Sequence, residues 1–269
     1  MADWEMVGEG DADATYGEVK KPKLKVKMLK AEDLQGLILW EDADFFVINK
    51  PPLISTLDER AKGFGVGLLR LAKEAFGDVQ AAHRLDKETS GCLAFAKNPA
   101  AYRHLAMQFE NREVTKIYHA LANGVHQLEG VRVYLPILLM NGGYVVIDKV
   151  EGKEAETIFN TLKNYKFTTL VECYPITGRM HQIRIHLAQL DAPIVADTRY
   201  GGKHLFLRDL KRKKFTLKKG TEELPLISRV ALHARELNFA KMDGERVHVI
   251  APYPKDIEAV LNQLDKYSK

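Results

Sequence analysis

Short apolar segments of two periodicities run along most of the chain, and their order is the feature that most constrains the fold. After a hairpin predicted at 37–50, strand-like segments lie at 114–123, 131–139, 143–149, 167–174, 230–239 and 246–251. Helical patterns lie at 66–76, 98–109, 153–163, 180–190 and 254–266, and Asn98 with Pro99 forms a typical helix start. Strands in runs, with helices interspersed, favour an α+β fold with a mixed, largely antiparallel sheet and flanking helices.

Charge is arranged in blocks at the N-terminus. Six acidic residues and no Lys or Arg occur up to Val19, and six lysines follow by Lys30. Such blocks have little apolar periodicity and are typical of an extended or disordered arm. We therefore expect residues 1–36 to form a charged, partly disordered extension, and residues 37–269 to form a single domain with its own core.

A second charged segment, residues 203–220, is strongly basic. It contains eight Lys or Arg and one acid, Asp209, so its net charge is +7, whereas the whole chain has +4. This local charge is compatible with a solvated loop or with an RNA-contacting element centred on Lys211, Arg212, Lys213 and Lys214.

Composition indicates a cytoplasmic protein. The N-terminus is acidic and lacks the basic and apolar regions of a secretory signal, and no continuous apolar run is long enough for a membrane span. The two cysteines, Cys92 and Cys173, lie in apolar segments and indicate neither a disulfide nor a metal site. No phosphate-binding glycine loop or serine-hydrolase elbow is present, and we expect no cofactor.

Three motifs contain residues that could carry chemistry. In the first, HRLDKETSG (83–91), Asp86 lies in a turn ahead of a strand, where it could project into a cleft or bond its own turn amides. In the second, GRMHQIRIH (178–186), Arg184 lies at the edge of an apolar helical stripe, and the two histidines are five apart, one too many for a helical zinc pair. In the third, Lys116-Ile117-Tyr118, the alternation of a strand places Tyr118 and Ile117 on opposite faces.

Together, and in their order along the chain, the motifs resemble those of the RluA family of pseudouridine synthases. Further similarities are Ile48-Asn49-Lys50-Pro51, Asp197 with Tyr200-Gly201-Gly202, and Leu232-His233-Ala234. The resemblance implies a central active-site cleft, an RNA stem-loop of tRNA or rRNA as the substrate, and no metal. It implies three catalytic residues: Asp86 as the catalytic acid, Tyr118 stacked on the target base, and Arg184 as the partner of Asp86. We expect further contacts to substrate or RNA from Lys50, His83, Arg84, Thr89, Arg179, His181, Gln182 and the basic cluster at 211–214.

The resemblance also sets the chemical requirement. Isomerising uridine breaks the C1′–N1 bond and forms a bond to C5 without net oxidation, so it requires neither a redox cofactor nor ATP. It requires an ionised carboxylate, and a bidentate arginine favours that form in a buried pocket. We expect Arg184 to supply this pairing to Asp86.

Two departures from the family pattern bear on the substrate. Residues 1–36 are too few for the S4-type RNA-binding domain of many members, and Met180 occupies a position where threonine is common. The lack of that domain tilts the expected substrate slightly towards tRNA, and we expect a monomer. Two alternatives are a non-catalytic RNA-binding or RNA-folding protein on the same fold, and a glycosidase that uses Asp86 and Glu88.

Overall fold

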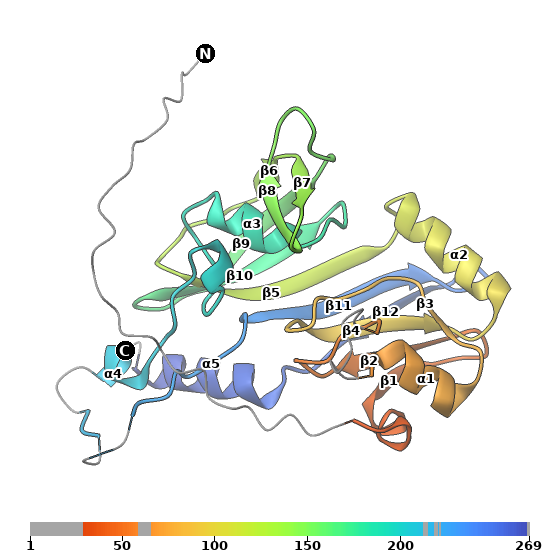
Figure 1. Ribbon diagram of the computed structural model, residues 1–269, viewed down its shortest axis with the longest axis horizontal. Helices are drawn as coiled ribbons and strands as arrows, with labels where there is room; N and C mark the ends of the chain where they lie inside the picture. Colours follow the sequence, from red (N-terminus) through yellow and green to blue (C-terminus); the bar gives the residue numbers. More distant parts are fainter. Residues whose placement is uncertain (1–28, 59–65, 212–214, 218–219, 221, 268–269) are drawn as a thin grey trace.

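A ten-stranded mixed sheet runs through the centre of the structure (Figure 1). The structure is a computed structural model that describes residues 29–58, 66–211, 215–217, 220 and 222–267. The strands of this sheet are β1 (Ile38–Glu41), β2 (Phe45–Lys50), β3 (Gln80–Ala81), β4 (Ser90–Ala96), β5 (Thr115–Asn123), β6 (Val131–Tyr134), β9 (Glu156–Asn164), β10 (Thr168–Pro175), β11 (Leu232–Ala240) and β12 (Arg246–Ile250). A separate hairpin consists of β7 (Ile137–Met140) and β8 (Tyr144–Ile147).

The helices flank this sheet. They are α1 (Leu68–Phe76), α2 (Pro99–Glu110), α3 (Gln182–Ala188), α4 (Leu207–Lys211) and α5 (Lys255–Tyr267), with 3-10 turns at Ala31–Asp33, Gln35–Leu37 and Thr198–Tyr200. No helix in the described part of the chain is long and apolar enough to cross a membrane. The predicted fold class, a mixed and largely antiparallel sheet with flanking helices, is confirmed.

Strand β4 is buried along its whole length because helices cover both of its faces. Its small residues, Cys92, Ala94 and Ala96, belong to the cluster beneath α2, while Leu93 and Phe95 belong to the cluster beneath α1. Figure 1 shows these two helices on opposite sides of the same end of the sheet. Alternating small and large residues therefore let one strand serve two packing layers.

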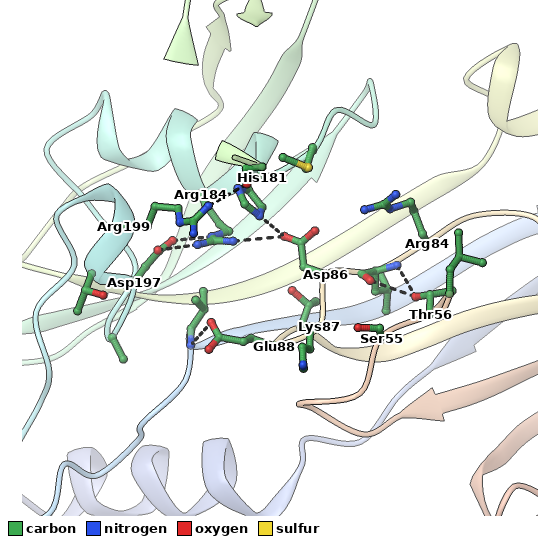
Figure 2. Close-up of a pocket in the computed structure, with 18 of the residues that line it drawn as sticks. Ser55, Thr56, Arg84, Asp86, Lys87, Glu88, His181, Arg184, Asp197 and Arg199 are labelled. Atoms are coloured by element: carbon green, nitrogen blue, oxygen red, sulfur yellow. Dashed lines mark hydrogen bonds and ion pairs between the residues drawn. The ribbon is translucent and has the colours of Figure 1, made fainter. Parts of the chain in front are cut away.

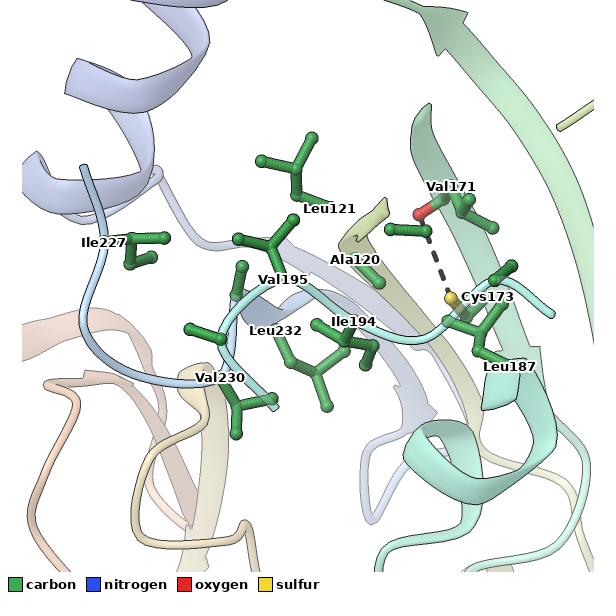
Figure 3. Packing of buried hydrophobic residues seen from close by; sticks show 14 of the residues in the cluster. Ala120, Leu121, Val171, Cys173, Leu187, Ile194, Val195, Ile227, Val230 and Leu232 are labelled. Carbon is green, nitrogen blue, oxygen red and sulfur yellow. Dashed lines mark hydrogen bonds between the residues drawn. The ribbon is translucent and has the colours of Figure 1, made fainter. Parts of the chain in front are cut away.

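The largest core cluster fills the other half of the molecule. It joins Leu187 of α3, Ile194 and Val195 of the segment that follows, and Leu232 of β11 (Figure 3). It extends to Leu264 of α5. This packing fixes both ends of the segment 189–197, which leads from α3 to Asp197.

The order of the sheet is β1-β2-β4-β11-β5-β10-β9-β6, and β4 with β11 is its one parallel pair among the described strands. Since parallel strands start at the same edge, the loops that precede β4 and β11 lie side by side. Strand β5 is antiparallel to β11, with Tyr118 opposite Ala234, and Cys173 of β10 is opposite Tyr118. The starts of β4 and β11 thus meet the end of β10 around Tyr118.

The structure corrects three predicted elements. The helix predicted at 153–163 is wrong: this stretch is mostly β9, which pairs with β10 and β6, because the run Thr157-Ile158-Phe159 suits a strand bonded on both sides better than a helix. The strand predicted at 131–139 breaks at Leu135-Pro136 into β6 and β7. Helix α3 is shorter than the predicted 180–190 because Met180 and His181 form part of the turn ahead of it.

The described packing begins ahead of the predicted domain boundary at residue 37. Leu34, between the first two 3-10 turns, is 1% exposed and lies in the cluster beneath α1. Residues 1–28 lie outside the described residues, as do Arg212, Lys213 and Lys214. The helix start predicted at Asn98 and Pro99 is confirmed, since Asn98 accepts a hydrogen bond from the Ala101 amide and Pro99 is the first residue of α2.

Gly91 sits at the contact between the parallel strands, so we expect Gly91→Ala to destabilise the fold. A Cβ there would lie 2.1 Å from the Ala234 carbonyl oxygen, and the φ angle is +114°. The expected loss of unfolding free energy is about 3 kcal/mol or more, measured by urea denaturation. Gly36→Ala is the control, because its Cβ would meet nothing within 4 Å. Equal losses in the two variants would contradict the packing argument.

Candidate active site

A pocket of about 1010 Å³ opens at the edge where β4 and β11 begin (Figure 2). Its walls come from segments far apart in the sequence: residues 55–58, the 84–89 loop, the start of α3, and residues 196–199. Asp86 lies between the wall that carries Arg184 and the wall that carries Thr56. The predicted central cleft is therefore lined by the residues of two of the three sequence motifs.

The backbone of the Asp86 loop is held on both sides. Thr56 Oγ1 accepts a hydrogen bond from the Leu85 amide (3.1 Å) and donates one to the Leu85 carbonyl (3.0 Å). The Thr89 amide donates to the Asp86 carbonyl (3.1 Å). The Asp86 side chain is 24% exposed, and its Oδ2 lies 3.6 Å from Arg184 Nη1 and 3.8 Å from His181 Nε2. The carboxylate thus faces the pocket beside a guanidinium.

The bidentate partner of Arg184 is Asp197, which corrects the predicted bidentate pair with Asp86. Arg184 Nε and Nη2 donate to the two carboxylate oxygens of Asp197 at 2.7 and 2.8 Å, and the Asp197 side chain is 1% exposed. These hydrogen bonds and the charge of Asp197 raise the pKa of Arg184, against the effect of burial. Asp197 follows Ala196, whose φ is +66°, so the backbone is strained where it presents this carboxylate.

His181 and Tyr200 form the wall next to this pair. The His181 backbone is left-handed (φ 53°), and its Nδ1 is hydrogen-bonded to the Tyr200 hydroxyl at 2.8 Å. Tyr200 also accepts a hydrogen bond from the Val145 amide of β8, and its ring centroid lies 5.1 Å from the guanidinium carbon of Arg184. Burial lowers the pKa of His181, and the charge of Asp86 opposes this shift. At neutral pH the ring is mostly uncharged beside Asp86.

A recess of about 100 Å³ adjoins the pocket, and Asp86, His181 and Arg184 line both cavities. Tyr118 lines the recess, as do Lys116 and Gly178. Burial and the nearby charge of Asp86 raise the pKa of Tyr118, so its hydroxyl stays protonated at neutral pH. Asp86, Tyr118 and Arg184, which the sequence places in three separate motifs, therefore meet around one cavity.

The other predicted contact residues divide into two groups. Arg84, Thr89, Arg179 and Gln182 line the pocket or the recess. Gln182 is buried and orders the turn ahead of α3, since its Oε1 accepts hydrogen bonds from Thr177 Oγ1 and the Arg179 amide. Lys211, whose Nζ lies 5.4 Å from the Tyr267 ring centroid, does not line either cavity.

His83 and Lys50 lie outside the pocket lining. His83 Nε2 accepts a hydrogen bond from the Ala94 amide, and its ring stacks on Phe109 at 4.7 Å. Burial, with a contribution from Lys116, lowers the pKa of His83 to about 3, so the ring is a neutral structural acceptor. Lys50 is fully buried beneath the loop, where its Nζ donates to the Lys87 carbonyl (3.2 Å) and the Pro51 carbonyl (3.0 Å).

Glu88, the second acid of the glycosidase alternative, accepts a hydrogen bond from the Val230 amide at 3.4 Å (Figure 2).

Sequence reasoning missed Asp197 and Tyr200 as site residues, although both belong to segments that resemble the family. Their pairing with Arg184 and His181 depends on the path of residues 189–197, which no local pattern encodes. Within the described residues, no three His, Cys, Asp or Glu side chains are grouped to hold a metal ion.

Comparison with known proteins identifies the class of this fold and site. The family model described as RNA pseudouridylate synthase matches residues 44–189. Ribosomal large subunit pseudouridine synthase C of Escherichia coli K12 is 36% identical over 241 residues, covering 87% of this chain and 72% of that protein. The protein of the same name from Vibrio vulnificus is 33% identical, covering 92% of this chain and 76% of that protein.

Solved structures agree with these matches. Human RNA pseudouridylate synthase domain containing 4 has a TM-score of 0.67 at 28% identity, covering 87% of this chain and 95% of that one. Human RNA pseudouridylate synthase domain containing 1 has a TM-score of 0.62 at 27% identity, covering 85% and 87%. The chain belongs to the RNA pseudouridylate synthase family, as its resemblance to the RluA branch predicts. It is an RNA pseudouridine synthase, an isomerase, which sets aside the two alternative functions.

We expect Asp197→Asn to lower kcat about tenfold or more, with RNA affinity little changed, because Arg184 would lose the charge that fixes its orientation towards Asp86. Pseudouridine formation and RNA binding are measured on the same preparations. The matched control is Asp191→Asn, an exposed position outside both cavities. A kcat equal to that of the control would show that the Asp197 charge does not matter.

The buried Lys50 gives a pH-dependent prediction. Burial, and then the charge of Arg229, lower its pKa to about 7, against an opposing effect of Asp86, whereas an unfolded lysine titrates near ~10.4. Between these values the unfolded chain binds more protons, so this group makes the unfolding free energy rise with pH. We expect Lys50→Met to lose this rise in urea denaturation from pH 6 to 10. The exposed Lys149→Met is the control; parallel pH profiles for wild type and Lys50→Met would contradict the prediction.

Proposed function

We propose that this enzyme converts specific uridines of large-subunit ribosomal RNA to pseudouridine, with Asp86 as the catalytic carboxylate. The observation that carries the proposal is that Asp86 faces the pocket beside Arg184 while Tyr118 lines the adjoining recess. The names of the bacterial relatives support ribosomal RNA over tRNA, in contrast to the slight preference for tRNA from the sequence alone. A cytoplasmic location and a monomeric state remain predictions.

The chemistry requires the base to stay bound after its bond to the sugar breaks. The C1′–N1 bond breaks, the uracil ring turns, and C5 bonds to C1′. C5 loses a proton and N1 gains one, so the product is an isomer of uridine. Whether the carboxylate adds to the base, adds to the sugar or assists a glycal route, it has to be ionised. Arg184 places a positive charge 3.6 Å from Asp86 without a bidentate bond to it, so the carboxylate stays available to the substrate.

Tyr118 is suited to holding the detached base. Its hydroxyl is a neutral phenol at neutral pH because its pKa is raised, so its ring can stack on uracil without placing a negative charge against it. It lines the recess that Asp86 also lines. We assign it to stacking on the target base.

The target uridine has to leave its stack to reach Asp86, and a stem-loop makes this least costly. Exposed Arg84 and the guanidinium of Arg199 line the pocket and can contact phosphates there. We assign the basic cluster Lys211, Arg212, Lys213 and Lys214 to RNA contact, because its charge suits phosphate binding and it lies in the sequence between His204 and Ser228, two residues that line the pocket.

We expect Asp86→Asn to abolish release of tritium from C5-labelled uridine while RNA affinity stays within roughly threefold, since the amide keeps the shape of the side chain and loses its charge. The assay uses ribosomal RNA fragments and tRNA transcripts separately. The surface variant Asp78→Asn, with 79% of its side chain exposed, is the control. Activity in Asp86→Asn would overturn the assignment, and release from tRNA alone would overturn the proposed substrate.

A further inference from the structure

Arg229 is a buried cation that lies under the Asp86 loop without lining the pocket. Its side chain is 2% exposed, and it makes six hydrogen bonds. Two of them form a bidentate pair with Asp256 in the first turn of α5, at 2.7 and 3.0 Å. The others reach the carbonyls of Glu88 (2.8 Å), Val230 and Leu232, and Ser90 Oγ. One guanidinium therefore connects the Asp86 loop, β4, β11 and α5.

The bond to Glu88 completes the anchoring of the loop. The Leu85 carbonyl is held by Thr56, the Asp86 carbonyl by the Thr89 amide, and the Lys87 carbonyl by Lys50. Arg229 holds the fourth carbonyl in this run. With four consecutive carbonyls bonded, the loop has little freedom to change the direction in which Asp86 points.

The sheet topology explains why Arg229 can reach this loop. Residues Arg229 and Glu88 precede β11 and β4, whose parallel pairing brings their first residues together, with His233 opposite Ser90. Asp256 then fixes the guanidinium from the α5 side, and its carboxylate compensates the buried charge. Arg229 and Asp256 both lie beyond residues 44–189, the part of the chain that the family model matches.

We propose that Arg229 is a positioning residue for the isomerisation: it holds the Asp86 loop so that the carboxylate meets the flipped uridine, and it links this loop to α5 through Asp256. The inference rests on the proposed role of Asp86. A residue that served only global stability would not need its bonds divided between the catalytic loop and three other segments. Displacement of a catalytic group by about 1 Å can cost roughly a hundredfold in rate, so a small shift of the loop matters.

The test compares Arg229→Lys with wild type, because lysine keeps the charge but cannot bond Glu88 and Asp256 in the same fork geometry. We expect kcat for tritium release to fall roughly ten- to a hundredfold, with KM little changed, after correction for the folded fraction obtained from RNA-binding stoichiometry. Hydrogen exchange should accelerate at the Leu85 and Thr89 amides and stay unchanged in the middle of β5. This local pattern distinguishes positioning from general destabilisation, which would affect both regions.

The matched control is Arg235→Lys. Arg235 also bonds the chain ahead of α5, at the Ala251 carbonyl, and its guanidinium lies over the Tyr253 ring, but neither of these contacts reaches the Asp86 loop. An unchanged kcat in folded Arg229→Lys, or an exchange increase spread evenly over the sheet, would overturn the proposal. If Arg229→Lys does not fold, Asp256→Asn replaces it: it keeps Arg229 and should show the same local exchange increase.

Two results keep this proposal separate from the proposed function. Loss of activity in Asp86→Asn with normal activity in Arg229→Lys would leave the function intact and overturn the positioning role. Activity retained in Asp86→Asn would remove the basis for positioning that residue. The exchange measurement needs no substrate, so it reports on the loop even if the chosen RNA is not modified.

Discussion

The close contact between β4 and β11 is the constraint on which the site depends. These strands run parallel at the position of Gly91 and Ala234, where a side chain at Gly91 has no room. Their parallel direction places two preceding loops at the same edge of the sheet, one with Asp86 and the other with Arg229. Antiparallel pairing of the same strands would carry those loops to opposite edges of the sheet. The parallel pairing therefore explains both the close contact at Gly91 and the position of the Asp86 loop beside Arg229.

Two buried guanidiniums at this edge are each paired with a carboxylate. Arg184 faces Asp197, Arg229 faces Asp256, and each pair is bidentate. A buried pair is a weak source of stability compared with apolar packing, but it fixes direction, because a guanidinium bonds a carboxylate in one plane. In both cases the orientation has a use near the pocket: one guanidinium presents Nη1 to Asp86 and the other presents Nη1 to the loop carbonyl.

The sequence predicts an element correctly where interactions between neighbouring residues determine that element. The Asn98-Pro99 helix start, the strand at 114–123 and the predicted sheet class follow from capping, alternation and the order of segments. The predicted helix at 153–163 failed because pairing with β6 and β10 decides that segment. The meeting of Asp86, Tyr118 and Arg184 could be anticipated through family resemblance alone, and the role of Asp197 required the path of the chain after α3. His83 shows the converse: it lies in the motif and turns into the core.

The division of bonds around Arg184 reconciles two demands on the catalytic carboxylate. Asp86 has to act as an anion beside the cation of Arg184, yet a bidentate pair would occupy both of its oxygens. Asp197 takes the two short hydrogen bonds and leaves Asp86 at 3.6 Å from Nη1, where the attraction acts without a hydrogen bond. The carboxylate is thereby stabilised by charge, directed by its anchored backbone, and available to the substrate. A second acid that pairs with the arginine is thus part of what makes the first acid reactive.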